Sequence, residues 1–306
     1  MHRPTNQRNL KFVLPFAAAA ILSFAAAVPQ PGLAGTPEKP AFGVYDPNAD
    51  FANTKGIDIE HVFMPWSNID LASLRKADAY AAERGRDLLL SVEPWSWSTD
   101  GTLPNDQLHD MILAGDYDGH IEEVCGAIGG LNTPVTIRWG HEMDSNTERY
   151  AWSLWSPEDY VTAYRRFVNE CRKVAPNAKF MWSPLGEASL KAYYPGDTYV
   201  DTIGLTVFGF QQYDKDQYGR EMGFTEHLAA RYKLVAEYNK PVVVAEAGCA
   251  GDQVYIDRCL QELVSPGAQF TQLEGVIYFN DIDPVAWPGH GTPNWRVPSD
   301  TFDFSN

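Results

Sequence analysis

Eight short runs of apolar or β-branched residues, alternating with segments of helical spacing, constrain the fold of this chain most strongly. Such an alternation is typical of a parallel sheet that is covered by helices. The predicted strands are Phe42–Asp46, His61–Trp66, Leu88–Trp95, Val135–Glu142, Phe180–Pro184, Thr202–Phe208, Val242–Glu246 and Val276–Asn280. Apolar residues recur at helical spacing in Leu71–Arg84, Gly119–Ile128, Pro157–Val174 and Phe224–Tyr238, which are the predicted helices.

Polar and aromatic residues gather at the ends of these strands, whereas the strand starts are ordinary. Eight strands with intervening helices predict an α/β fold, a single-domain (β/α)8 TIM barrel over residues 35–306, whose active site forms at the C-terminal strand ends. An open doubly wound sheet is the alternative, but such a sheet binds its ligand at one switch point and does not need polar and aromatic residues at nearly every strand end. The strand-end residues are Tyr45, Asp46, Trp66, Glu93, Trp95, His141, Glu142, Trp182, Ser183, Phe208, Glu246, Phe279 and Asn280.

The first 34 residues have the pattern of a secretory signal peptide and its processing region. Basic residues at positions 3, 8 and 11 precede an apolar stretch, and small residues follow at 25–27 and 32–34. Cleavage after Ala27 or Ala34 would release a secreted or periplasmic protein. An uncleaved membrane anchor is the alternative, but the stretch contains Pro15 and is shorter than the roughly 20 residues of a membrane span.

The chain is acidic, with a formal net charge of −16, which becomes −19 when the three basic residues of the signal are removed. Nucleic acid and anionic membranes are therefore poor partners. We expect a monomer that acts on neutral molecules and is not membrane-associated after cleavage.

Four cysteines accompany the secretion signal, and this combination favours disulfides over metal binding or redox chemistry. We favour a pairing of Cys125 with Cys171, on successive predicted helices. Cys249 would then pair with Cys259 and connect a loop to the helix after it. Free buried thiols are the alternative.

Glu142 and Glu246 end the fourth and seventh predicted strands, and barrel closure would place them on facing sides of one pocket. Two opposed carboxyl groups are what glycoside hydrolysis requires, and a separation of about 5 Å would indicate a retaining mechanism. Arg138 precedes Glu142 on the same strand and alternates to the same face, where it can hold a carboxylate ionised. These residues alone do not assign the acid and the nucleophile.

The motif Arg138-x-x-His141-Glu142-Met143 resembles the fourth-strand signature of glycoside hydrolase family 26, retaining barrel enzymes best known as endo-β-1,4-mannanases. The resemblance implies that Glu142 is the acid/base and Glu246 the nucleophile, with Arg138 supporting the nucleophile. It also implies that His141 orients the acid/base and contacts sugar. Further matches are Trp182-Ser183-Pro184, Ser156-Pro157-Glu158-Asp159-Tyr160 and Val200-Asp201.

The chain departs from this family in three respects. Asp144 stands where the family usually has Asn, and the aromatic residues after it, Tyr150 and Trp152, come later than the usual Trp. Phe208 stands where the sixth strand usually ends with a Tyr that hydrogen-bonds the nucleophile. These departures bear on the choice of substrate more than on catalysis.

Further residues at or after the strand ends are predicted to bind the glycan. Sugar rings stack on aromatic side chains, and sugar hydroxyls bond to polar ones. Trp139 lies between two inward-facing residues and is expected to face the helices instead, and for Glu93 a structural partnership with a buried cation is the alternative. The predicted substrate-binding residues are Asp46, Trp66, Glu93, Trp95, Asp144, Trp152, Trp182, Phe208, Gln211, Asn280 and Trp287.

The sequence therefore predicts a secreted retaining endo-β-glycanase that requires no cofactor or metal. No H-E-x-x-H or G-x-S-x-G motif indicates metal or serine chemistry. The expected substrate is β-1,4-mannan first and mixed-linkage β-1,3-1,4-glucan second. The alternative is a catalytically degenerate barrel that binds glycan in exopolysaccharide handling.

Overall fold

In this computed structural model the chain divides into two units, Met1–Thr36 and Pro37–Asn306, and only the second is described here. The structure describes residues 39–66, 70–95, 97–98, 101–102, 105–145, 147 and 149–302, without the side chains of residues 97–106. The predicted signal peptide, residues 1–34, lies outside these ranges. Within them, no helix combines the length and apolar character that crossing a membrane would require.

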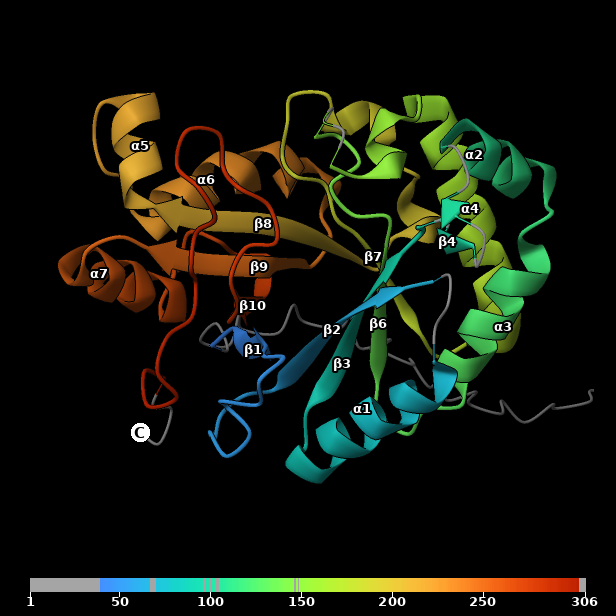
Figure 1. Ribbon diagram of the computed structural model, residues 1–306, viewed down its shortest axis with the longest axis horizontal. Coiled ribbons are helices and arrows are strands. Elements are labelled where there is room, and N and C mark those ends of the chain that lie inside the picture. The colour runs from blue at the N-terminus through green and yellow to red at the C-terminus, as the bar shows by residue number, and fades with distance from the viewer. Residues whose placement is uncertain are drawn as a thin grey trace, which may run out of the picture. The chain divides into compact units, whose positions relative to one another are not determined.

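Eight parallel strands close into a barrel, which confirms the predicted (β/α)8 fold (Figure 1). Neighbouring strands follow the order β1–β10–β9–β8–β7–β6–β3–β2 around the barrel, and the short hairpin β4–β5 (Trp97–Ser98 and Gly101–Thr102) stands apart. The barrel strands are β1 (Ala41–Tyr45), β2 (Ile59–Pro65), β3 (Asp87–Glu93), β6 (Val135–Trp139), β7 (Lys179–Trp182), β8 (Thr202–Phe210), β9 (Val242–Ala250) and β10 (Leu273–Phe279).

Seven α-helices in the described residues cover the outside of this barrel unevenly. α1 follows β2, α2 and α3 follow β3, α4 follows β6, α5 and α6 follow β8, and α7 follows β9. The described part of the chain after β10 contains no helix. The helices are α1 (Leu71–Arg84), α2 (Asn105–Ala114), α3 (Asp118–Gly129), α4 (Pro157–Val174), α5 (Gln211–Tyr218), α6 (Phe224–Val235) and α7 (Gln253–Val264).

Helix α4 shows why the sequence pattern predicts these elements well. The Ser156 side chain accepts the Asp159 N–H at 3.2 Å, and Pro157 occupies the first turn, where its missing N–H costs nothing. Most of the apolar residues of the helix recur at helical spacing on one buried face, whereas Val174 in the last turn is exposed. Its buried residues are Tyr160, Ala163, Tyr164, Phe167, Val168 and Cys171.

Alternation along the strands separates the barrel interior from the layer beneath the helices. In β9, Val243 and Ala245 join a small interior cluster with Leu89, while Val242 and Val244 pack in the outer core. Nearer the C-terminal strand ends, the interior positions of the barrel are occupied by polar residues. The buried polar residues on the barrel strands there are His61, Ser91, Arg138, Thr206 and Glu246.

Both predicted disulfides are present. Cys125–Cys171 joins α3 to α4, and Cys249–Cys259 joins β9 to α7. Cys249 lies within β9 rather than in a loop, because this strand is longer than the sequence predicts.

Candidate active site

Glu142 lies in the turn after β6, because the strand ends earlier than predicted. β6 stops at Trp139, so the predicted strand Val135–Glu142 is too long. Gly140 has a φ of +55° and Glu142 a φ of +56°, both in the left-handed region. A non-glycine residue in this region is uncommon, and such residues cluster at functional sites. The Glu142 N–H donates to the Ser183 carbonyl at 2.7 Å and ties the turn to the end of β7.

Glu246 lies inside β9, at an irregularity in the pairing of this strand with β8. Val244 pairs with Leu205 and Glu246 pairs with Thr206, so β9 has one extra residue, Ala245, at this point. Such a β-bulge bends the strand and redirects the side chains around it. The strand then continues beyond the predicted end.

Arg138 connects Glu246 to the polar interior of the barrel. Its Nη1 donates to Glu246 Oε1 at 2.6 Å and to Ser91 Oγ at 3.1 Å, and its Nε donates to Ser183 Oγ at 2.9 Å. A charge-assisted bond of this length favours the ionised carboxylate. The expected contact between Arg138 and Glu246 is present, whereas the two supporting serines were not predicted as site residues.

The Glu142 carboxyl lies near Glu246 and is held there by a threonine on β8. Thr206 Oγ1 donates to Glu142 Oε1 at 2.7 Å. Because Thr206 is the register partner of Glu246, this bond brings the Glu142 carboxyl beside Glu246. The two glutamates are only 4 % and 6 % exposed. Two acids from separate predicted strand ends therefore share one buried site.

Burial is the strongest influence on the Glu246 carboxyl, and together with the negative charge of Glu142 it raises the pKa of Glu246 to about 7. The Arg138 guanidinium opposes this shift through its charge and its hydrogen bond. Near neutral pH the carboxyl of Glu246 is therefore balanced between its two forms, and Arg138 is the group that holds it toward the ionised one.

Comparison with known proteins matches this site to a family of glycosidases. The model of glycosyl hydrolase family 26 matches residues 112–246, which include Arg138, Glu142 and Glu246. The chain is 27 % identical to a β-1,3-xylanase of an Alcaligenes species over 188 residues, which are 59 % of this chain and 36 % of that protein. The chain is a homologue of the family 26 glycoside hydrolases.

Endoglucanase H of Acetivibrio thermocellus is a second relative, 26 % identical over 251 residues, which are 78 % of this chain and 26 % of that protein. The chain therefore spans about a quarter of one of these curated relatives and about a third of the other.

Solved family 26 structures have the same fold. GH26C from a Muricauda species aligns with a TM-score of 0.62 at 15 % identity, over 84 % of this chain and 81 % of that one. The catalytic domain of a family 26 endo-β-1,4-mannanase from Bacillus sp. JAMB-750 aligns with a TM-score of 0.59 at 18 % identity, over 79 % and 77 %.

His141 precedes Glu142 in the family 26 signature, but its ring bonds elsewhere. Its Nε2 shares a hydrogen bond with the Tyr150 hydroxyl at 3.1 Å, and its Nδ1 has no partner among the described residues. Burial, followed by the charge of Arg138, lowers the pKa of His141 well below its usual value, so the ring is neutral. The side chain is fully buried against Tyr150, and the predicted roles of His141 in orienting Glu142 and contacting sugar stay predictions.

Glu93 and Trp95 lie at the end of β3 and stay partly exposed. Trp95 Nε1 donates to Glu93 Oε2 at 3.1 Å, and Glu93 Oε1 lies 3.9 Å from His141 Nε2. Burial raises the pKa of Glu93, against the effects of Trp95 and Arg138. Both residues keep surface that a sugar could contact, so their predicted roles in binding stay predictions.

Asp144 is a clamp within the protein rather than a contact for substrate. Its carboxylate accepts the backbone N–H groups of Leu185, Gly186 and Glu187 at 2.6, 3.0 and 2.8 Å. The residue is buried. The predicted substrate-binding role of Asp144 is therefore wrong in this structure, since its acceptors are used by the loop after β7.

Three tryptophans that were predicted to bind substrate are fully buried. Trp66, Trp152 and Trp182 have no exposed surface and pack on aromatic residues of neighbouring helices and loops. These predictions are corrected, because large apolar rings at the strand ends fill the core below the rim. Trp139 faces the helices as expected and stacks on Phe167 of α4 at 5.1 Å between ring centroids.

Asp46, Gln211 and Asn280 are likewise buried and bonded within the protein. Asn280 Nδ2 donates to Asp46 Oδ1 at 3.3 Å, and Gln211 Nε2 donates to Asp252 at 2.8 Å. These bonds connect the segments that follow β1, β8, β9 and β10, and the predicted contacts of Asp46, Gln211 and Asn280 with sugar hydroxyls stay predictions.

Half-buried aromatic side chains form a wall where β8 meets the C-terminal segment. Phe208 stacks on Trp295 at 4.6 Å, and Trp287 packs edge-on against Tyr213 at 4.9 Å. The C-terminal segment, red in Figure 1, runs beside β8, β9 and α5. Phe208 and Trp287 keep exposed surface, so their predicted roles in stacking on sugar stay predictions.

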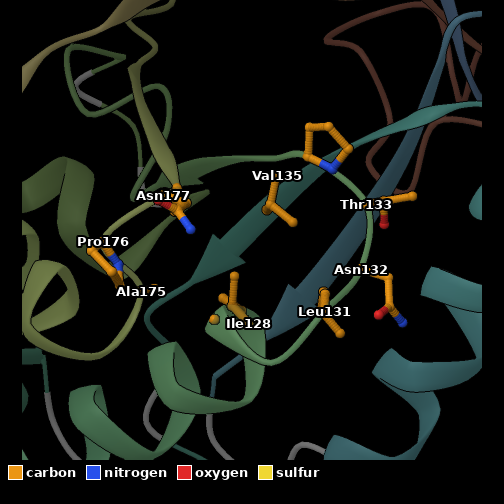
Figure 2. Close-up of a pocket in the computed structure, with 11 residues that line it drawn as sticks. Ile128, Leu131, Asn132, Thr133, Val135, Ala175, Pro176 and Asn177 are labelled. Atoms are coloured by element: carbon orange, nitrogen blue, oxygen red, sulfur yellow. The ribbon is translucent and has the colours of Figure 1, made fainter.

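Two open cavities in the described part of the chain are lined by residues other than these carboxylates. One, of about 280 Å³, lies at the N-terminal end of the barrel and is lined by the first residue of β6, Val135, and by residues that precede β6 and β7, including Thr133 and Asn177 (Figure 2). The other, of about 440 Å³, lies between α7 and residues 296–302. In TIM barrels the N-terminal end is associated with stability and the C-terminal end with catalysis. We therefore locate the candidate active site at Glu142 and Glu246.

Proposed function

We propose that this protein is a retaining endo-β-glycanase in which Glu246 is the nucleophile and Glu142 the acid/base. The observation that carries this proposal is the convergence of the two carboxyls, one bonded to Arg138 and the other to Thr206, at the C-terminal strand ends. A barrel that only binds glycan would not need two carboxyls in this arrangement.

In the first step, the Glu246 carboxylate would attack the anomeric carbon while Glu142 donates its proton to the departing glycosidic oxygen. This forms a glycosyl ester and frees the first product. In the second step, ionised Glu142 takes a proton from water, whose oxygen attacks the anomeric carbon and displaces Glu246. Arg138 disperses the negative charge of Glu246 before attack and after release.

A β-linked polysaccharide is the proposed substrate, with β-1,4-mannan first and mixed-linkage β-1,3-1,4-glucan second. Support comes from the family 26 β-1,4-mannanase whose barrel resembles this one, and from the endoglucanase among the relatives. The Alcaligenes relative adds β-1,3-xylan as a substrate to be tested.

We also propose secretion or export to the periplasm, followed by action as a monomer. The two disulfides support an oxidising compartment, because such bonds are rare in the cytosol.

Hydrolysis is tested by incubating the purified protein with β-mannan, mixed-linkage β-glucan and β-1,3-xylan and sizing the products. Endo-action predicts oligosaccharides that shorten with time, and a retaining mechanism predicts that the β-anomer appears first by NMR. Glu142→Gln and Glu246→Gln should each lower kcat/KM at least about 10³-fold, since each removes a group that acts in the transition state.

The exposed Glu158→Gln is the matched control and should keep full activity with the same circular dichroism spectrum. Wild-type-like hydrolysis by either active-site variant would refute the assignment. Binding of a glycan without hydrolysis of any would instead support the degenerate glycan-binding barrel.

A further inference from the structure

One hydroxyl group holds the proposed acid/base, and it comes from a residue that the sequence motifs do not mark. Thr206 Oγ1 donates to Glu142 Oε1 at 2.7 Å, and both side chains are buried. Thr206 also stands opposite Glu246 in the pairing of β8 with β9. It therefore bonds to one carboxyl and lies on the strand next to the one that carries the other.

This bond distinguishes the two oxygen atoms of Glu142. A threonine hydroxyl has one proton, and when it donates to Oε1 it stabilises the ionised form of the carboxyl. Because Oε1 is engaged, the proton that Glu142 gives and takes resides on Oε2. The backbone of Glu142 is held separately, by its N–H bond to the Ser183 carbonyl.

The Thr206 hydroxyl lies on the same strand as Phe208, which stands where the family usually has a Tyr hydroxyl. The Phe208 ring stacks on Trp295 and has no hydroxyl. The hydroxyl that β8 contributes to the carboxyl pair is that of Thr206, two residues earlier, and it bonds to Glu142, whereas Glu246 receives its donor from Arg138.

We propose that Thr206 is a positioning residue for the acid/base, which holds Glu142 Oε1 and leaves Oε2 to transfer the proton. The proposal rests on the proposed function of Glu142. Its alternative is a packing role, in which only the volume of the threonine matters, and valine has nearly the same volume without the hydroxyl.

Thr206→Val should lower kcat/KM on the polysaccharide about 10- to 100-fold, within the range that general acid catalysis contributes. On a 2,4-dinitrophenyl β-glycoside, whose leaving group needs no proton, the loss should stay below about threefold. The alkaline limb of the pH profile should move to higher pH, because the ionised form of the acid/base loses a hydrogen-bond donor. Thr206→Ser should restore both properties.

Thr202→Val is the matched control, since Thr202 is a buried threonine on the same strand. A uniform loss on both substrates with an unchanged alkaline limb would overturn the proposal. If Thr206→Val folds poorly, Thr206→Ala removes the same hydroxyl and makes the same comparison.

Direct titration keeps this test separate from the proposed function. In protein with ¹³C-labelled glutamate carboxyls, Glu142→Gln identifies the signal of Glu142 by its loss. Thr206→Val should move the titration of that signal to higher pH, and an unchanged titration overturns the positioning role whether or not the protein turns over any glycan. Absence of hydrolysis by the wild type would refute the proposed function alone.

Discussion

Glu246 combines two opposing influences at a single residue. Burial removes the solvation that an ionised carboxylate needs, whereas Arg138 supplies a positive partner at 2.6 Å. The result is a pKa of about 7, well above the ordinary value of 4.5. A nucleophile with this pKa is ionised only in the upper part of the physiological range.

This balance predicts how the rate depends on pH. The reactive form has ionised Glu246, so kcat/KM should fall about tenfold per pH unit below about pH 7. Arg138→Gln removes the group that lowers the pKa and should move this acid limb to higher pH. Initial rates between pH 4 and 9 measure both effects. An acid limb near pH 4.5 in the wild type would contradict the prediction.

At the scale of elements, the site depends on turns and loops that follow the strands more than on the strands themselves. The turn after β6 contains two left-handed residues, and Asp144 within it binds the loop after β7 through three backbone N–H groups. The two segments thereby hold each other next to Glu142.

Removal of this clamp should destabilise the protein. Asp144→Ala leaves buried N–H groups without acceptors and should lower the free energy of unfolding by about 2–4 kcal/mol. Asp144→Asn keeps one acceptor oxygen and should lose less. Urea unfolding followed by circular dichroism measures both variants, and equal stabilities of Asp144→Ala and wild type would show that water replaces the clamp.

At the scale of the whole molecule, two disulfides join elements at different distances from the site. Cys125–Cys171 closes a loop of 46 residues between outer helices, and Cys249–Cys259 closes one of 10 residues beside the strand that carries Glu246. The entropy that a disulfide removes from the unfolded chain grows with the length of the loop that it closes.

Paired alanine variants should separate stability from activity. Loss of Cys125–Cys171 should cost about 4 kcal/mol with nearly unchanged kcat at a temperature where the protein stays folded. Loss of Cys249–Cys259 should cost about 3 kcal/mol and also lower kcat, because β9 loses its tie to α7. Denaturant melts and initial rates test this, and the reverse order of stabilities would contradict the loop-length argument.

Periodicity alone predicts much of this fold. The bounds of α1 and α4 agree with the predicted segments, because one apolar stripe and clear caps define each helix. Helix α5 was not predicted, because its sequence, QQYDKDQY, is polar on nearly every face. The roles predicted for Asp144 and the buried tryptophans were wrong because a residue at a strand end can face the cleft or the core.

The sequence by itself determined the barrel and the gathering of Glu142, Glu246 and Arg138 at one end, since these follow from the order of strands and helices, and it favoured the two disulfide pairings that the structure has. Only the tertiary structure decided that Glu142 leaves its strand through a left-handed turn, that a bulge redirects Glu246, and that Thr206 bonds the acid/base. The physical reason is that these features depend on contacts between strands that are distant in sequence. No local pattern encodes where such partners meet.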